Sequence, residues 1–290
     1  MYEPRWEAPT TVEQVAAILS SAGERARLIA GGTDLTILIR RGEVRPSVLV
    51  DLGRVDGLSY VESEKGLGRA ELGALATHAQ VASDHVLRAR ATALADACRT
   101  VGSPQIRARG TIVGNIVNAS PAADGAVALL ALGAAVHVRS GSPGRDPGGP
   151  IPLERFFEGP GRVALKPTEF VTAVSFELPE VNARSAYLKI GQRSALAIAI
   201  ASAAVVFEPS AGRVRIALGS VAPTPVRAAA AERLFEGEWG RARDHGTVID
   251  EVAEAAVGAA SPIDDVRASA WYRADLVRTL IRRALKKLCV

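Results

Sequence analysis

The chain carries, at residues 28–35, the sequence Leu28-Ile29-Ala30-Gly31-Gly32-Thr33-Asp34-Leu35. Its apolar start predicts a strand over residues 27–30, the two glycines end that strand, and Thr33 with Asp34 favours the start of a helix. A second buried strand is predicted over residues 48–52. Strand, glycine turn, helix and strand in this order predict a small parallel unit near the start of the chain.

The glycine turn of this unit has the chemistry to hold a phosphate, because main-chain N–H groups at a strand-to-helix turn can point at an anion. A plain turn would contain the same residue types. The turn has neither the GxGxxG pattern nor a following GK[ST], so it predicts neither a Rossmann site nor a P-loop.

A second stretch places polar side chains among apolar ones, and its sequence is Arg109-Gly110-Thr111-Ile112-Val113-Gly114-Asn115-Ile116-Val117-Asn118-Ala119-Ser120-Pro121-Ala122-Ala123-Asp124. Polar groups in such surroundings need hydrogen-bond partners. The loop's own backbone could provide them, or a ligand could. Together with the first turn, a ligand with a phosphate-containing centre, such as a dinucleotide, would be held at two places.

The rest of the chain predicts two units with different characters. Residues 101–117 contain too many glycines, a proline and clustered arginines for a regular element, although several apolar side chains there suit a core. Beyond residue 151 the pattern predicts an antiparallel meander followed by three helices. The four strands of this meander are expected at 170–178, 184–190, 197–207 and 214–220, and the helices at 226–234, 248–260 and 270–288.

Composition excludes several classes of protein. The 290 residues include 35 Lys and Arg against 31 Asp and Glu, and the basic residues are scattered while aromatics make up only 4%, so nucleic-acid binding is not predicted. The two cysteines, Cys98 and Cys289, lie too far apart for a CxxC motif, and the four histidines have no ligand spacing, so no metal site is expected. The polar first ten residues predict no signal peptide, and no apolar run reaches the roughly 20 residues of a transmembrane helix. A cytoplasmic protein is predicted.

The two stretches above, in their order and wording, resemble the FAD-binding medium subunit of the molybdenum hydroxylases, the family of xanthine dehydrogenase and carbon monoxide dehydrogenase. Further blocks extend the resemblance over essentially the whole chain. They are Leu165-Lys166-Pro167-Thr168-Glu169-Phe170-Val171-Thr172, Tyr187-Leu188-Lys189-Ile190-Gly191-Gln192-Arg193, Ala217-Leu218-Gly219-Ser220-Val221-Ala222-Pro223-Thr224-Pro225-Val226-Arg227 and Asp265-Val266-Arg267-Ala268-Ser269-Ala270-Trp271-Tyr272-Arg273.

The resemblance implies an α+β fold with two domains. Residues 1–178 would form a two-lobed FAD-binding domain of the vanillyl-alcohol-oxidase (PCMH) type. Residues 179–290 would form a smaller domain of antiparallel sheet and helices. Trp271 and Tyr272 are expected to be ordinary packing residues at the start of a helix.

The resemblance also implies a set of FAD contacts. The two glycine-containing loops would wrap the pyrophosphate, Asp124 would meet ribityl or ribose hydroxyls, Val171 would lie near the isoalloxazine ring and Lys189 near its polar edge. From the residues alone, Lys189 reads as a solvent-facing strand residue. The sequence departs from the family at Val113, where a glycine is usual. The full set of predicted cofactor-binding residues is Leu28, Ile29, Ala30, Gly31, Gly32, Thr33, Asp34, Leu35, Thr111, Gly114, Asn115, Ser120, Asp124, Val171 and Lys189.

The implied function is electron transfer, with no catalytic side chain of the chain's own. FAD would take electrons from the 2Fe–2S centres of a small subunit and pass them to NAD, a quinone or another acceptor. A large subunit would hold the molybdopterin, in a heterotrimer or a dimer of heterotrimers. Two alternatives remain open: a self-sufficient FAD-dependent reductase, for which no convincing proton donor is found, and a flavin-free scaffold subunit.

Overall fold

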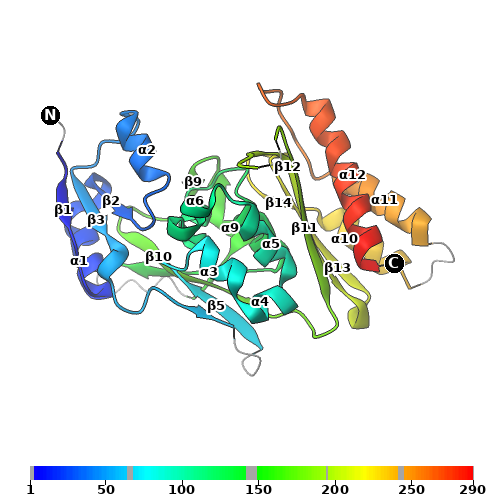
Figure 1. Ribbon diagram of the computed structural model, residues 1–290, viewed down its shortest axis with the longest axis horizontal. Coiled ribbons are helices and arrows are strands. Elements are labelled where there is room, and N and C mark those ends of the chain that lie inside the picture. Colours follow the sequence, from blue (N-terminus) through cyan, green and yellow to red (C-terminus); the bar gives the residue numbers. More distant parts are fainter. Residues whose placement is uncertain (1–2, 64–67, 142–148, 194, 241–244, 290) are drawn as a thin grey trace.

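A computed structural model describes residues 3–63, 68–141, 149–193, 195–240 and 245–289. Three bodies follow one another along the long axis of the molecule, in the order of the sequence (Figure 1). They are a small N-terminal lobe, a larger second lobe and a C-terminal domain. The N-terminus and the C-terminus lie at opposite ends.

The N-terminal lobe is the predicted parallel unit. Its sheet has the order β1-β3-β2, and β3 pairs in parallel with both neighbours. The turn at 30–34 therefore lies between β2 and α2, as the sequence predicts. The elements are β1 (Arg5–Glu7), α1 (Val12–Ala22), β2 (Ala26–Ile29), α2 (Leu35–Arg40) and β3 (Val48–Asp51), with short 3₁₀ turns at Gly23–Arg25 and Leu52–Arg54.

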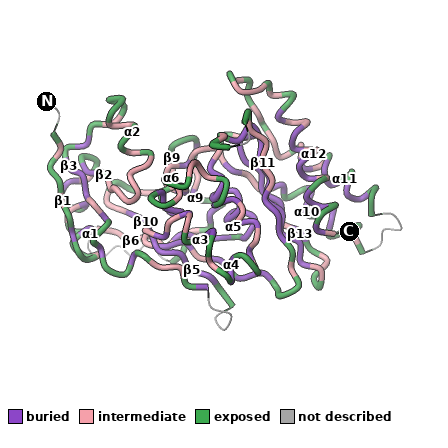
Figure 2. The backbone as a smooth tube through the Cα atoms, in the orientation of Figure 1, coloured by how far each residue is buried: buried purple, intermediate pink, exposed green. Residues whose placement is uncertain are grey.

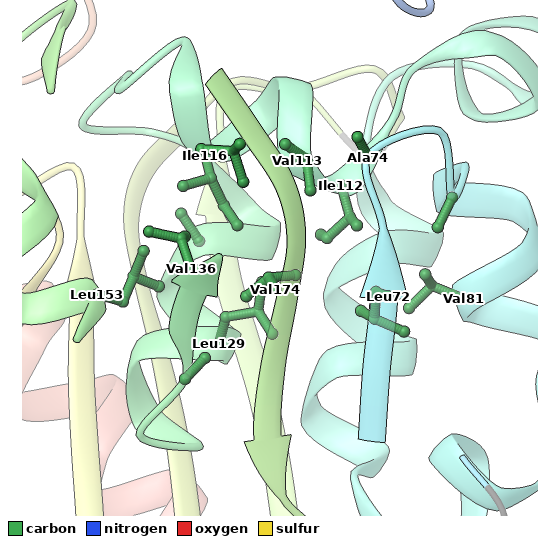
Figure 3. Packing of buried hydrophobic residues seen from close by; sticks show 14 of the residues in the cluster. Leu72, Ala74, Val81, Ile112, Val113, Ile116, Leu129, Val136, Leu153 and Val174 are labelled. Atoms are coloured by element: carbon green, nitrogen blue, oxygen red, sulfur yellow. The ribbon is translucent and has the colours of Figure 1, made fainter. Parts of the chain in front are cut away.

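The second lobe is built on a sheet with the order β4-β5-β10-β6-β7. The first strand of the expected meander, at residues 170–178, has other partners than the prediction gave it: β10 (Glu169–Glu177) pairs with β5 and β6 here and is not part of the C-terminal sheet. Strand periodicity identifies a strand but does not choose its partners, and Val174 of β10 packs with Leu72 and Val136 in this lobe (Figure 3). The other strands are β4 (Val61–Glu62), β5 (Arg69–Gly73), β6 (Ala135–Ser140) and β7 (Ile151–Pro152).

Short helices cover one face of this sheet and enclose the core shown in Figure 3. Residues 101–117 are regular, contrary to the prediction, because Ser103 and Thr111 each cap a six-residue helix by accepting a main-chain N–H. The helices are α3 (His78–Ser83), α4 (His85–Arg90), α5 (Thr92–Thr100), α6 (Pro104–Arg109), α7 (Ile112–Val117), α8 (Asp124–Ala131) and α9 (Leu153–Phe156), followed by the hairpin β8 (Phe157–Gly159) and β9 (Arg162–Val163).

The C-terminal domain is an antiparallel sheet with the order β11-β12-β13-β14 and three helices on its outer face (Figure 1). The last helix buries the apolar face that its sequence predicts, including Val277, Ile281 and Ala284. The elements are β11 (Arg184–Gly191), β12 (Ala199–Glu208), a 3₁₀ turn at Pro209–Ala211, β13 (Arg213–Gly219), β14 (Val226–Arg227), α10 (Ala229–Glu238), α11 (His245–Val257) and α12 (Ala270–Cys289).

The inner face of the C-terminal sheet packs directly on α5 and α8 of the second lobe. Tyr187, Ala204 and Ala217 of this sheet belong to the same apolar core as the second lobe. A Cβ on Gly219 would lie 2.5 Å from Val127 Cγ2, so only glycine lets β13 approach α8 this closely. The buried backbone in Figure 2 accordingly runs without a break from the second lobe into the C-terminal sheet.

The start of α12 differs from the prediction. Trp271 is 76% exposed and Tyr272 40% exposed, so neither is a packing residue. The helix buries Arg273 instead, whose guanidinium donates to the Ile200 and Ser220 carbonyls and to Asp265. In the part of the chain that the structure describes, no helix is long and apolar enough to cross a membrane.

Candidate functional site

The two loops predicted to hold a phosphate meet backbone to backbone. A Cβ on Gly31 would overlap the Arg109 carbonyl oxygen and would lie 2.9 Å from Gly110 Cα. Any side chain at Gly31 would therefore push the loops apart. Gly32 follows with φ +73°, a conformation that favours glycine and turns the chain from β2 into α2.

The turn between β2 and α2 is accessible, with Gly31 to Thr33 half-buried and Asp34 exposed. Among the described residues, no hydrogen bond is donated by the main-chain N–H groups of Thr33 and Asp34. The Asp34 carboxylate lies 3.4 Å from the Thr33 hydroxyl and 3.4 Å from the Asn118 amide nitrogen. Asn118 thus joins the second loop to the first.

The second stretch, residues 109–124, is called the second loop here although it contains the short helix α7, and its own polar side chains largely shape it. Thr111 Oγ1 accepts from the Gly114 N–H at 3.0 Å, and Ser120 Oγ accepts from the Ala122 N–H at 3.2 Å. Asn115 Oδ1 accepts from the Ala126 N–H at 3.2 Å and ties the loop to the first turn of α8. These three side chains therefore accept hydrogen bonds from main-chain N–H groups. This is the alternative to direct contact with a ligand that the sequence left open. Gly114 remains exposed.

The Val113 side chain does not obstruct the accessible surface of this loop. Its side chain is 5% exposed and lies in the core beside Ile112 and Ala74 (Figure 3). The valine that stands where the family usually has glycine therefore packs inward, away from the accessible surface of the loop.

Beyond the loops, Asp124 forms a nearly buried ion pair with Lys189. Lys189 Nζ lies 2.6 Å from Asp124 Oδ2, and the two side chains are 11% and 8% exposed. Lys189 also donates to the Thr100 carbonyl at 3.0 Å. Lys189 is thus not the solvent-facing residue that its strand position alone suggests, because α5 covers the inner face of β11.

Tyr187 supplies a further donor to this pair. Its hydroxyl lies 2.5 Å from Asp124 Oδ1, and the Thr100 hydroxyl lies 3.4 Å from Asp124 Oδ2. Burial raises the pKa of Tyr187 well above its ordinary value, and the charge of Asp124 raises it further. The hydroxyl therefore keeps its proton and donates at any pH near neutrality.

A buried histidine, His78, lies beside the second loop and hydrogen-bonds to its main chain. His78 donates its main-chain N–H to the Gly110 carbonyl at 3.0 Å, and its ring Nδ1 lies 3.4 Å from Cys98 Sγ. Burial, with the nearby charge of Arg107, lowers the pKa of His78 to about 4, and burial raises the pKa of the Cys98 thiol. Both groups are uncharged at neutral pH and serve as packing.

The site residues form one continuous row from the N-terminal lobe to the C-terminal domain. Gly31 touches the loop at Gly110, Asn115 of that loop binds α8, and the first residue of α8 is Asp124. An extended ligand along this row would meet main-chain N–H groups at one end and the Asp124–Lys189 pair at the other. The residues fit FAD, whose pyrophosphate needs close backbone approach and whose hydroxyls need acceptors.

Val171 is not brought to the surface of this row. It is 4% exposed in the core at the bulge of β10, a strand that packs against α7. The apolar residues Leu28, Ile29, Ala30 and Leu35 flank the first turn and are half-buried.

Three residues in contact with the row were absent from the predicted set: Thr100, Asn118 and Tyr187. Asn118 and Tyr187 had a sequence signal, because Asn118 lies within the second stretch and Tyr187 lies two residues before Lys189, on the same face of a strand. Thr100 had none, since it reaches Asp124 only through the packing of α5 against α8.

Two models of known protein families match this chain, one after the other. Residues 2–181 match the model of the FAD binding domain in molybdopterin dehydrogenase. Residues 186–288 match the model of the CO dehydrogenase flavoprotein C-terminal domain.

Individual proteins are similar in sequence to this chain over nearly its whole length. The medium chain of carbon monoxide dehydrogenase from Hydrogenophaga pseudoflava is 30% identical over 98% of this chain and 97% of its own length. The 6-hydroxypseudooxynicotine dehydrogenase complex subunit alpha from Paenarthrobacter nicotinovorans is 31% identical over 96% of this chain and 91% of its own length.

The fold agrees as well. A chain in the structure of carbon monoxide dehydrogenase from Hydrogenophaga pseudoflava lacking the Mo-pyranopterin moiety superposes with a TM-score of 0.90, at 29% identity over 99% of this chain and 97% of that one. The α+β fold with an FAD-binding domain and a flavoprotein C-terminal domain is therefore confirmed. This chain belongs to the FAD-binding medium subunits of the molybdenum hydroxylases, the oxidoreductase family of carbon monoxide dehydrogenase and xanthine dehydrogenase.

Proposed function

We propose that this chain relays electrons within a molybdenum hydroxylase complex, from the 2Fe–2S centres of a small subunit through FAD to NAD, a quinone or another acceptor. A large subunit with the molybdopterin would oxidise the substrate, in a heterotrimer or a dimer of heterotrimers in the cytoplasm. The observation that carries this proposal is the continuous row from Gly31 to Lys189, which suits FAD. The two distant cysteines cannot hold a cluster, so the electrons would come from another chain.

Different residues would contact different parts of FAD. The main chain at Gly31 to Asp34 and at Thr111 to Asn115 would approach the pyrophosphate, with Ser120 shaping the end of the second loop. Asp124 would accept from a ribityl or ribose hydroxyl. Bound FAD supplies a carrier that can accept electrons from an iron–sulfur centre and give them to a two-electron acceptor.

Lys189 would act through its charge. A cation near the pyrimidine edge of a flavin favours the anionic reduced form and raises the reduction potential. Thr100 and Asp124 hold the ammonium group in place. We place Val171 behind the ring as part of the apolar wall, and we place the domain boundary after residue 178.

Exposed apolar side chains support contact with a partner chain. Val266, Trp271 and Ile198 are 99%, 76% and 61% exposed. The segments that carry Ile198 and Val266 approach each other, since the Gln192 amide lies 3.5 Å from the Arg267 carbonyl oxygen, and Trp271 lies shortly after Val266 at the start of α12. Exposed apolar groups that lie together are a feature of surfaces that another chain covers.

An anaerobic experiment tests the relay. The FAD-loaded full chain is mixed with aldehydes and purines, then reduced chemically and mixed with NAD, quinones and dyes, while the flavin absorbance is followed. We expect no bleaching by the substrates and reoxidation by at least one acceptor. Bleaching by a substrate without other subunits would instead indicate a self-sufficient reductase. A flavin that stays reduced toward every acceptor would indicate a structural role.

A further inference from the structure

We propose that Tyr187 of the C-terminal domain is a positioning residue for FAD, which acts by fixing the orientation of the Asp124 carboxylate. This inference rests on the proposed function, in which Asp124 accepts from a hydroxyl of FAD. It assigns to the C-terminal domain a part in cofactor binding besides the cation that Lys189 provides.

The Tyr187 hydroxyl is aimed at Asp124 and held there by packing. Tyr187 and Lys189 lie two residues apart on β11, so both side chains leave the same face of the sheet, toward α8. Tyr187 is 7% exposed and its ring belongs to the core shared with the second lobe. The ring therefore has little freedom to move, and the hydroxyl has a fixed place.

The Tyr187 hydroxyl takes up one of the acceptor positions of the Asp124 carboxylate. A carboxylate offers about four lone-pair positions. Tyr187 occupies one position on Oδ1 and Lys189 occupies one on Oδ2. The Thr100 hydroxyl donates its single proton to the Ala97 carbonyl at 2.8 Å and makes only a 3.4 Å contact with Oδ2. One position on Oδ1 is left for a donor outside the chain.

The orientation of the carboxylate depends on Tyr187 because the other close donor, Lys189, lies on the other oxygen. Lys189 and Thr100 both contact Oδ2, and neither fixes Oδ1. Without the hydroxyl, Oδ1 would face apolar surroundings with no donor, which is costly for a charged group. The carboxylate would turn to bring both oxygens toward the Lys189 ammonium group, and the remaining acceptor position would point elsewhere.

The test is Tyr187→Phe in the full chain, stripped of flavin and titrated with FAD while flavin fluorescence is followed. We expect the Kd to rise about tenfold, the worth of a hydrogen bond to a charged group. In the Asp124→Ala background, Tyr187→Phe should change the Kd less than about twofold, because nothing is left to position.

A matched control is available in the same chain. The Tyr60 hydroxyl lies 2.7 Å from Glu71 Oε1, the same kind of bond at the β4 edge of the second-lobe sheet. Tyr60→Phe should leave the Kd for FAD unchanged. A Tyr187→Phe chain with the wild-type Kd, or one with the same loss in the Asp124→Ala background, would overturn the inference.

A second measurement keeps the hydroxyl and needs no variant at position 187. The full chain is labelled with 3-fluorotyrosine, its four ¹⁹F signals are assigned by substituting the other three tyrosines, and FAD is added. The Tyr187 signal should shift and the Tyr60 signal should not. An unmoved Tyr187 signal in a chain that binds FAD contradicts the inference alone, whereas a wild-type chain that binds no FAD overturns the proposed function.

Discussion

A Gly31→Ala chain is expected to fold and to bind FAD at least about 100-fold more weakly than the wild type. The added Cβ would overlap the Arg109 carbonyl oxygen, which belongs to main chain and has no rotamer to adopt. The two loops must then separate, and both lose their approach to the pyrophosphate. Overpacking of this kind costs about 1–3 kcal/mol, which a chain with two large apolar cores can tolerate.

The measurement is the Kd for FAD of the flavin-free chain, together with its thermal unfolding. Gly237→Ala is the matched control, because a Cβ on Gly237 would meet nothing within 4 Å. The control should bind FAD as the wild type does. A Gly31→Ala chain that is purified yellow with one FAD per chain would show that the two loops do not form the cofactor site.

Removing the cation of the buried ion pair should have the largest effect on stability. Lys189→Met leaves Asp124 charged and nearly buried with the Tyr187 hydroxyl as its close donor, and we expect the free energy of unfolding to fall by about 3 kcal/mol. The reduction potential of the bound flavin should fall as well, because the cation that favours the reduced anion is gone. Denaturant unfolding of the flavin-free chain and potentiometry of the loaded chain measure the two effects.

Charge balance separates this effect from a loss of packing. The double variant Lys189→Met, Asp124→Leu should regain most of the lost stability, because no buried charge remains. Lys166→Met is the control, since Lys166 is half-exposed and lies 3.9 Å from Glu169, and it should cost less than about 1 kcal/mol. Equal losses in Lys189→Met and Lys166→Met would contradict the account of a buried pair.

The sequence was sufficient for features that depend on local patterns. The parallel unit around Gly31 follows from an apolar run, a glycine turn and a second apolar run within 25 residues. The buried face of α12 follows from its helical spacing. Each of these is set by residues close together in the chain.

Features that depend on distant packing were missed. Strand β10 looks like its C-terminal neighbours, and only the presence of β5 and β6 on either side assigns it to the second lobe. Residues 101–117 form helices because Ser103 and Thr111 act as caps, a role that hydroxyls play equally well in loops.

In the site, too, local features could be predicted from the sequence and long-range contacts could not. Gly31, Gly32 and the second loop are visible in the sequence because glycines and clustered polar residues are rare in apolar surroundings. The ion pair of Asp124 with Lys189 is not visible, since the two residues lie 65 positions apart and meet only because β11 packs on α5, which in turn packs on α8. Individual contacts with FAD remain predictions.

We infer that two backbone loops hold a pyrophosphate, and titration of the flavin-free full chain with FAD, FMN and ADP checks this directly. FMN has one phosphate and no second nucleoside. We expect FAD to bind at least about 100-fold more tightly than FMN, the worth of one to two charge-assisted hydrogen bonds, and ADP to compete with FAD. FMN binding as tightly as FAD, with no competition from ADP, would contradict the claim.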